Sequence, residues 1–202
     1  MEVEGIALND GHKAEPSVFY HGSSALFRRF DLAHALEGDG KVKFGYGVYV
    51  TSCYRSAAHY AGANPAAREY FVYAVEVPAV NDENSIAFKK PVSAAIVRRA
   101  AEALGEAIPE KYVVDGKAFR KFLARRLTGK VDFDGEKAAS SFLSSIGVDF
   151  IVWPYSWRNP SLGTNMAVLN ENRMRIIRVE QVELDQRMQL IEGSRRAINI
   201  EL

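Results

Sequence analysis

The sequence predicts an α+β fold, in which strand-forming segments near both ends of the chain enclose a helical middle third. Short runs of β-branched and aromatic residues that stop at Gly or Pro indicate strands within residues 18–78 and again within 148–179. Between them, apolar residues recur at helical spacing, and glycines follow where helices would end. With 202 residues, 48% of them apolar and 25% charged, the chain has the size and composition of one globular domain, residues 1–202.

The first half of the chain is expected to hold three strands and one helix. The strands are predicted at Val18–His21, Phe44–Thr51 and Glu69–Val77. Residues Ser52–Ala61 are expected to form a helix, with Ser52 as its N-cap and alanines that allow close packing on a sheet. Residues 1–16 are polar and contain glycine, so we expect them to be a loose N-terminal arm.

The rest of the chain is expected to be helical first and then mainly strand. Helices are predicted at Ser93–Leu104, Lys117–Leu127 and Glu136–Ile146, and strands at Val148–Pro154, Met166–Leu169 and Met174–Val179. The residues after Glu180 mix charged and spaced apolar side chains, and this pattern fits either a short helix or a strand.

Composition argues against several classes of protein. No apolar run approaches the roughly 18 residues that a membrane-spanning helix requires. Residues 1–5 are acidic and lack the basic end and apolar stretch of a signal peptide. Cys53 is the single cysteine and cannot form an internal disulfide. We therefore expect a cytoplasmic protein.

One basic segment, Lys117–Lys130, stands out although the formal net charge of the whole chain is only +1. Its apolar residues recur at helical spacing, which is typical of a core-packed helix with a solvated charged face. The alternative is a surface that follows the phosphates of a nucleic-acid substrate. The sequence leaves both interpretations open.

Three blocks of sequence carry the candidate chemistry. They are Phe19–Ser24 (FYHGSS), Phe44–Thr51 (FGYGVYVT) and Ser56–Ala61 (SAAHYA). Each places a polar or aromatic side chain at the end of a strand or on a helix, with glycines where a flat ring would approach the backbone. In this order, the blocks resemble the ADP-ribosyltransferase fold in its His-Tyr-Glu branch, that of diphtheria toxin and the poly-ADP-ribose polymerases. Small bacterial and phage members of this branch are the most similar.

The resemblance implies an ADP-ribosyltransferase-like fold, in which split antiparallel sheets surround a cleft for NAD. Residues 82–146 would then be a helical insertion. It also implies an NAD-dependent ADP-ribosyltransferase, with NAD as co-substrate. The four histidines and one cysteine show no metal-ligand spacing, so we expect no metal. No phosphate-binding loop and no nucleophile elbow of a hydrolase appears in the sequence.

The resemblance also assigns roles to individual residues. The backbone of Gly22 would hold the nicotinamide carboxamide through paired hydrogen bonds, with Ser23 beside it. His21 would bind the ribose on the adenosine side. Tyr49 and Tyr60 would sandwich the nicotinamide ring, whose departure leaves a positively charged ribosyl group.

The sequence departs from the family pattern at two positions. The polymerases carry a Ser three residues before the second tyrosine, where this chain has Ala57; Ser56 lies one position earlier and is the candidate for that contact. Asn165 stands where the family has a Glu that binds the ribose 2'-hydroxyl. An amide can hydrogen-bond a hydroxyl but cannot take its proton. Glu171 is the rival carboxylate, expected at the far end of the sheet.

The expected function is mono-ADP-ribosyl transfer, because Asn165 disfavours the elongation of poly-ADP-ribose. The resemblance suggests a toxin of a toxin-antitoxin or phage-conflict system, or an effector delivered into the cytoplasm of a target cell. Its partners would be a protein or nucleic-acid acceptor and a neutralising antitoxin or immunity protein. The alternatives are an NAD glycohydrolase and an inactive module that binds NAD or ADP-ribose.

Overall fold

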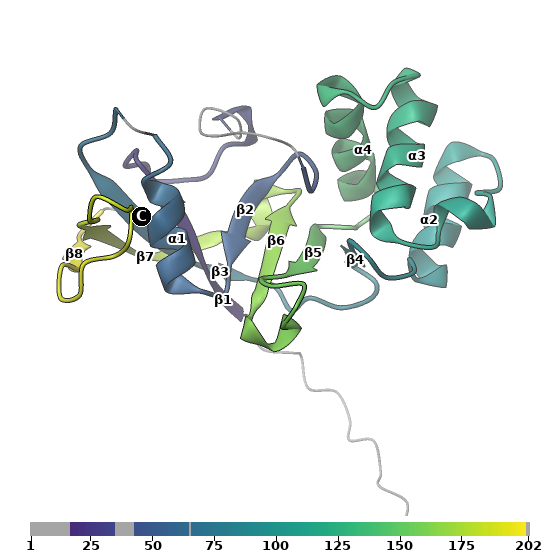
Figure 1. The fold of residues 1–202 in the computed structure, drawn as a ribbon. Coiled ribbons are helices and arrows are strands. Elements are labelled where there is room, and N and C mark those ends of the chain that lie inside the picture. The colour runs from purple at the N-terminus through teal and green to yellow at the C-terminus, as the bar shows by residue number, and fades with distance from the viewer. Residues whose placement is uncertain (1–16, 35–42, 65, 201–202) are drawn as a thin grey trace, which may run out of the picture.

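The computed structural model describes residues 17–34, 43–64 and 66–200. These residues form one eight-stranded sheet, four α-helices and short 3-10 turns (Figure 1). The strands are β1 (Ser17–Ser23), β2 (Val48–Thr51), β3 (Tyr70–Val77), β4 (Ser85–Ala87), β5 (Phe150–Pro154), β6 (Thr164–Val168), β7 (Arg175–Val182) and β8 (Arg196–Ile198). The helices are α1 (Tyr54–Ala61), α2 (Ala94–Leu104), α3 (Gly116–Thr128) and α4 (Phe133–Ser145). The predicted α+β class is confirmed, whereas the expected N-terminal arm, residues 1–16, lies outside the described residues.

The sheet has the strand order β4-β5-β6-β2-β1-β3-β7-β8, and its pairs are antiparallel except for β4 with β5. The two halves of this sheet share one paired residue position, between β1 and β2. Strand β1 pairs with β3 along its whole length, from Ser17 to Ser23, but it pairs with β2 only where Tyr20 lies opposite Thr51. We expected two separate small sheets, and the structure has a continuous one with a narrow junction. On its other edge, β2 pairs with β6 along its whole length.

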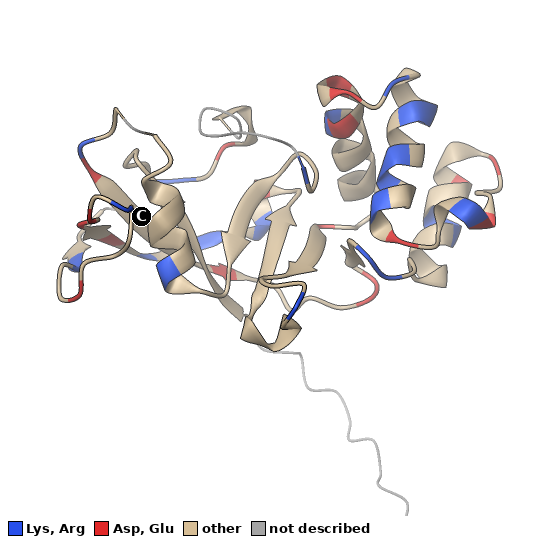
Figure 2. Cartoon of the chain, in the orientation of Figure 1, with Lys and Arg blue, Asp and Glu red and all other residues tan. Residues whose placement is uncertain are grey.

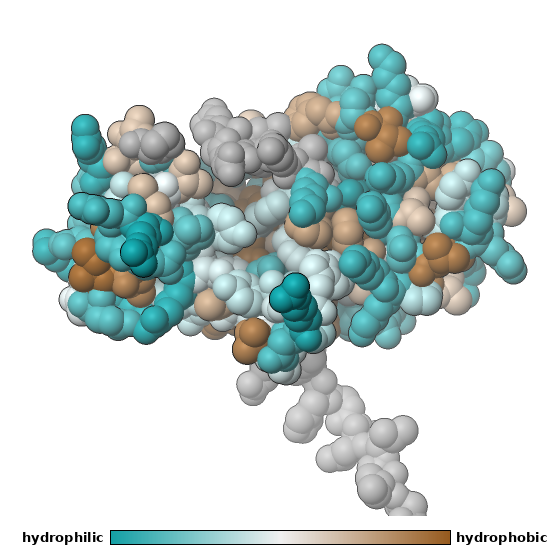
Figure 3. All heavy atoms as spheres, viewed as in Figure 1, coloured by the Kyte–Doolittle hydropathy of each residue, from teal (hydrophilic) through white to brown (hydrophobic). Residues whose placement is uncertain are grey.

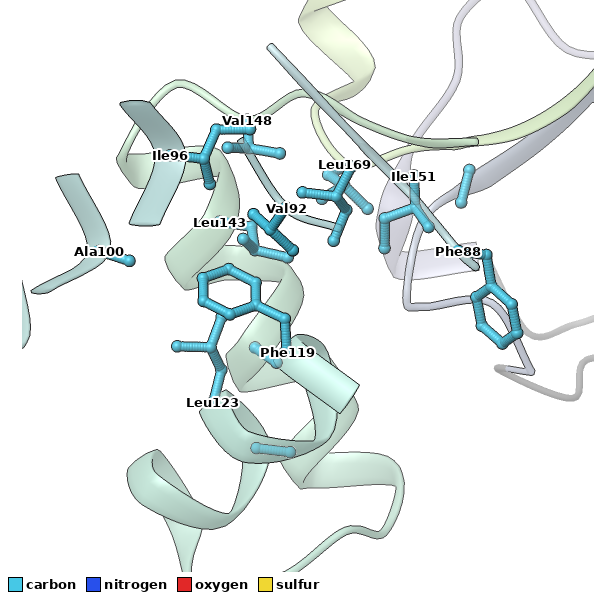
Figure 4. Packing of buried hydrophobic residues seen from close by; sticks show 14 of the residues in the cluster. Phe88, Val92, Ile96, Ala100, Phe119, Leu123, Leu143, Val148, Ile151 and Leu169 are labelled. Atoms are coloured by element: carbon cyan, nitrogen blue, oxygen red, sulfur yellow. The ribbon is translucent and has the colours of Figure 1, made fainter. Parts of the chain in front are cut away.

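Helices cover the sheet in two places. Helix α1 packs on β1 and β3 through Ala57 and Ala58, whose small side chains let the helix approach Val72. Helices α2, α3 and α4 gather beside β4 and β5 at the other end of the sheet (Figure 1). Figure 4 shows their core, in which Phe119 and Leu123 of α3 lie near Leu143 of α4; Ile151 of β5 belongs to the same cluster.

The three predicted helices of the middle segment are confirmed, and their ends follow from local residues. The side chains of Ser93, Asp115 and Asp132 accept hydrogen bonds from backbone N–H groups in the first turns of α2, α3 and α4. Helices α2 and α3 end at Gly105 and Gly129, both left-handed. No helix in the described part of the chain is long and apolar enough to cross a bilayer.

Two local expectations are wrong. Strand β2 begins at Val48, and the preceding residues form a turn in which Gly45 has a φ of 115°. Ser52 is not the N-cap of α1: Cys53 holds that position, and the Ser52 hydroxyl accepts from the backbone N–H of Thr164 at 2.9 Å. That bond ties the start of α1 to β6, a contact that local sequence does not reveal. Strand β4 was missed, since three residues are too few for a pattern, and the segment after Glu180, for which a short helix or a strand was expected, contains strand β8.

Close packing between β1 and α1 predicts that Gly22 tolerates no side chain. A Cβ atom there would lie 1.7 Å from the carbonyl oxygen of Ala57. We expect Gly22→Ala to lower the free energy of unfolding by about 3 kcal/mol, because the backbone of α1 or β1 would have to move to make room for the added Cβ. Gly105→Ala is the control: its Cβ would meet open space, and only its left-handed conformation should cost about 1 kcal/mol. Urea unfolding measures both, and equal losses would contradict the proposed packing.

Candidate functional site

His21 lies at the junction between the two halves of the sheet. Its Nδ1 atom is 2.8 Å from the backbone carbonyl oxygen of Tyr49, across the gap between β1 and β2. A carbonyl oxygen only accepts hydrogen bonds, so Nδ1 must carry the proton. Burial lowers the pKa of His21, which favours the neutral ring. The Nε2 atom is therefore an unprotonated acceptor.

Aromatic side chains surround the imidazole of His21 on one face of the sheet. The ring of Phe30 meets it edge-on at 5.1 Å, and Phe27 and Tyr73 lie 6.2 Å from it. The Tyr73 hydroxyl donates to the carbonyl oxygen of Ala25 and accepts from the N–H of Phe27, and burial raises its pKa to about 12. Tyr73 thus fastens the segment after β1 over His21.

Tyr49 anchors the turn that precedes β2. Its hydroxyl accepts from the N–H of Phe44 and donates to the carbonyl oxygen of Gly45, both at 3.0 Å. Its ring meets Trp153 edge-on at 5.4 Å, and burial raises the pKa of its hydroxyl. The Tyr49 side chain therefore fixes the glycine turn, while the backbone carbonyl oxygen of the same residue orients His21.

Gly22 and Ser23 follow His21 on β1 and lie near α1. A Cβ on Gly22 would also come within 2.7 Å of the N atom of Ala61, so the glycine has a packing reason as well as the expected ligand-binding one. The Ser23 hydroxyl accepts from the N–H of Ala25 at 3.0 Å. It therefore shapes the local turn, and the proposed carboxamide contacts of both residues remain predictions.

On helix α1, Ser56 and Tyr60 differ in exposure. Ser56 is buried, whereas Tyr60 is 66% exposed and its ring contacts His59. Tyr60 lies one helical turn from Ala57, the residue that covers Gly22. Figure 3 shows the surface recessed between the α1 side of the molecule and the helices α2–α4. Within the described residues, the Tyr49 and Tyr60 rings make no contact with each other.

Asn165 is the second residue of β6, the strand that pairs with β2. It lies opposite Thr51, and Tyr49 lies opposite Ala167, so the side chains of Tyr49 and Asn165 share one face about 7 Å apart. Asn165 is half-buried, and its amide makes no side-chain hydrogen bond to another described residue. Tyr49 and Asn165 thus share the face of the sheet opposite His21.

Glu171 lies beyond the other end of β6, in the 3-10 turn Glu171–Arg173. It lines a surface pocket of about 460 Å³ together with Arg28, Phe30 and Arg175. Asn165 lies diagonally across from Tyr49 in the pairing of β2 with β6, whereas Glu171 follows the end of β6.

Two charged residues near the site were missed by the sequence reading. Arg120 of α3 and Glu136 of α4 are buried and form an ion pair. The available signal was their position: each falls inside the buried stripe of its helix, beside Phe119 and Leu123 in α3 and beside Ala139 and Leu143 in α4. Arg120 belongs to the basic segment, which is helical as predicted. The charge of Arg120, however, is buried and does not face solvent.

Searches of protein-family models, curated proteins and solved structures find no match to this chain. Among the residues that the structure describes, no cluster of three or more His, Cys, Asp or Glu side chains could hold a metal ion.

The lowered pKa of His21 predicts a pH dependence of stability. Below its ordinary value of 6.5, the unfolded chain takes up a proton that the folded chain still rejects. Folding stability should fall on acidification through this window, by up to about 1.4 kcal/mol per pH unit. His21→Gln should show a smaller loss between pH 7 and pH 5 in urea unfolding.

His59→Gln is the matched control for this measurement, because His59 is an exposed histidine on α1. It should keep the pH dependence of the unmodified chain. Identical acid-induced losses for all three proteins would show that His21 is not held neutral by burial.

Proposed function

We propose that this chain is an NAD-dependent mono-ADP-ribosyltransferase. The observation that carries the proposal is the hydrogen bond from His21 Nδ1 to the Tyr49 carbonyl oxygen at the sheet junction. It leaves a neutral Nε2 facing away from β2 as an acceptor for a ribose hydroxyl. A neutral acceptor held in one orientation suits the binding of a sugar hydroxyl better than it suits the donation of a proton.

The two faces of the junction supply the remaining groups for a dinucleotide. Tyr49 and Asn165 share one face, and α1 brings Tyr60 near Gly22. The nicotinamide would lie against Tyr49, with its ribose 2'-hydroxyl hydrogen-bonded to the Asn165 amide. The role of His21 as the acceptor for the adenosine ribose comes from the family resemblance, because its ring lies on the face of the sheet opposite Tyr49 and Asn165.

The proposed reaction is the one that the family resemblance implies. The bond between the ribose carbon and the nicotinamide nitrogen breaks, and its electron pair leaves with nicotinamide. The resulting ribosyl cation bonds to a nucleophile of the acceptor, which loses its proton. Asn165 can orient the ribose but cannot accept that proton, so the acceptor or solvent must take it. This supports a single transfer to a macromolecular acceptor, as a toxin or effector would carry out.

An alternative is a module that binds NAD or an ADP-ribosylated ligand without turnover. The observation in its favour is again Asn165, which places an amide where a carboxylate would be expected. The two functions predict different chemistry with the same ligand.

Release of nicotinamide from NAD tests the proposed function. The purified protein should release nicotinamide only when cell lysate is added, because an acceptor is required. Tyr49→Ala should abolish this release and weaken NAD binding, by an amount on the order of 1–3 kcal/mol. Release without lysate would indicate a glycohydrolase. NAD binding without release under either condition would indicate the inactive module.

Variants of the third site residue test its assignment. Asn165→Ala should lower the rate of nicotinamide release by a factor of roughly ten to a thousand, as expected for the loss of a hydrogen bond that strengthens in the transition state. Asn165→Glu should be tolerated, since a carboxylate can bind the same hydroxyl. Glu171→Gln is the control. A dead Glu171→Gln beside a normal Asn165→Ala would move the site to the other end of β6.

A further inference from the structure

The helices α3 and α4 share a buried ion pair that packing alone does not require. The Nε atom of Arg120 is 2.7 Å from Oε2 of Glu136, and the two side chains are only 3% and 9% exposed. Burial raises the pKa of Glu136, which shows the cost of removing its charge from water, and Arg120 offsets that effect. Apolar side chains of similar volume could fill the same space. The burial of this pair therefore points to a role other than stabilising the fold.

Arg120 reaches past Glu136 to the turn before β2. Its Nη2 atom donates to the carbonyl oxygen of Lys43 at 3.1 Å. Its Nη1 atom lies 3.3 Å from the place where a Cβ of Gly45 would stand. Arg120 thus contacts two elements, with its Nε atom beside the Glu136 carboxylate and its Nη2 atom hydrogen-bonded to the turn.

Helix α4 holds the same turn at a second point. The hydroxyl of Ser140, one helical turn after Glu136, accepts from the backbone N–H of Tyr46 at 3.0 Å. The turn is therefore fastened to both helices of the insertion. On its other side it is fastened to Tyr49, through Phe44 and Gly45.

We propose that Arg120, held in place by Glu136, is a positioning residue that fixes the Lys43–Tyr46 turn and thereby the ring of Tyr49. Contacts run without a break from the ion pair through the turn to Tyr49 and on to His21. The helical insertion thus shapes the nicotinamide side of the site. The ligand in this statement rests on the proposed function, whereas the positioning of the turn does not.

Three variants separate positioning from stability. Arg120→Lys keeps the charge opposite Glu136 but loses the Nη2 group that donates to the carbonyl oxygen of Lys43. The double variant Arg120→Met/Glu136→Leu removes both charges together, so that no unpaired charge stays buried. The matched control is Arg126→Met/Glu106→Leu, which removes an exposed ion pair at the other end of α3 with an Nε to Oε1 distance of 2.5 Å. Thermal unfolding should give similar midpoints for all of them.

Amide hydrogen exchange tests the positioning without any ligand. In the double variant and in Arg120→Lys, the amides of Phe44 and Tyr46 should exchange at least about tenfold faster, while those of α1 stay as in the unmodified chain. The control should change neither. Unchanged exchange at Phe44 and Tyr46 would overturn the proposal, whether or not the protein binds NAD.

Ligand affinity tests the consequence for the site. Titration with NAD and with ADP-ribose, which lacks nicotinamide, should show that the double variant binds NAD about tenfold more weakly and ADP-ribose as well as before. Equal losses for both ligands, or no loss for either, would refute a specific effect on the nicotinamide side. If the unmodified chain binds neither ligand, the proposed function fails, and the exchange measurement alone decides the positioning.

Discussion

The hydrogen bond between His21 and the Tyr49 carbonyl oxygen is the contact on which the candidate site depends. Strands β1 and β2 share a single residue pair, and this hydrogen bond adds a second link between them, above a core cluster that includes Phe19 and Val50. The imidazole bridges the strands where their backbones no longer pair. Because the same bond fixes the ring orientation, the structural junction and the ligand-binding acceptor are one group.

Around this junction, residues of the site also carry structural roles. Gly22 leaves room for the backbone of α1, and Tyr49 closes the turn before β2. Tyr73 holds the segment after β1 above His21. A substitution at any of these positions changes both packing and ligand contacts. Activity measurements on such variants therefore need a stability measurement beside them.

The basic segment illustrates how charge and position combine. Helix α3 carries several cationic residues (Figure 2), among which Arg120 faces inward and pairs with Glu136 while Arg126 faces outward and pairs with Glu106. The outward pair sits in water, where such contacts contribute little. The inward pair lies in a low-dielectric region, where electrostatic interactions are stronger than in water. Through Arg120 it also contacts the turn before β2.

The sequence by itself determined the α+β class, the helices of the middle segment and most strands. Hydrophobic periodicity, N-cap residues and the glycines that end helices are all signals within short stretches of sequence. The sequence also indicated His21, Gly22, Tyr49 and Asn165 through short blocks that resemble a family. Only the tertiary structure decided that Ser52 bonds to β6, that Tyr49 anchors a turn, and that Arg120 and Glu136 pair beneath it. These contacts join residues far apart in the chain, and their energies depend on burial, which no local pattern encodes.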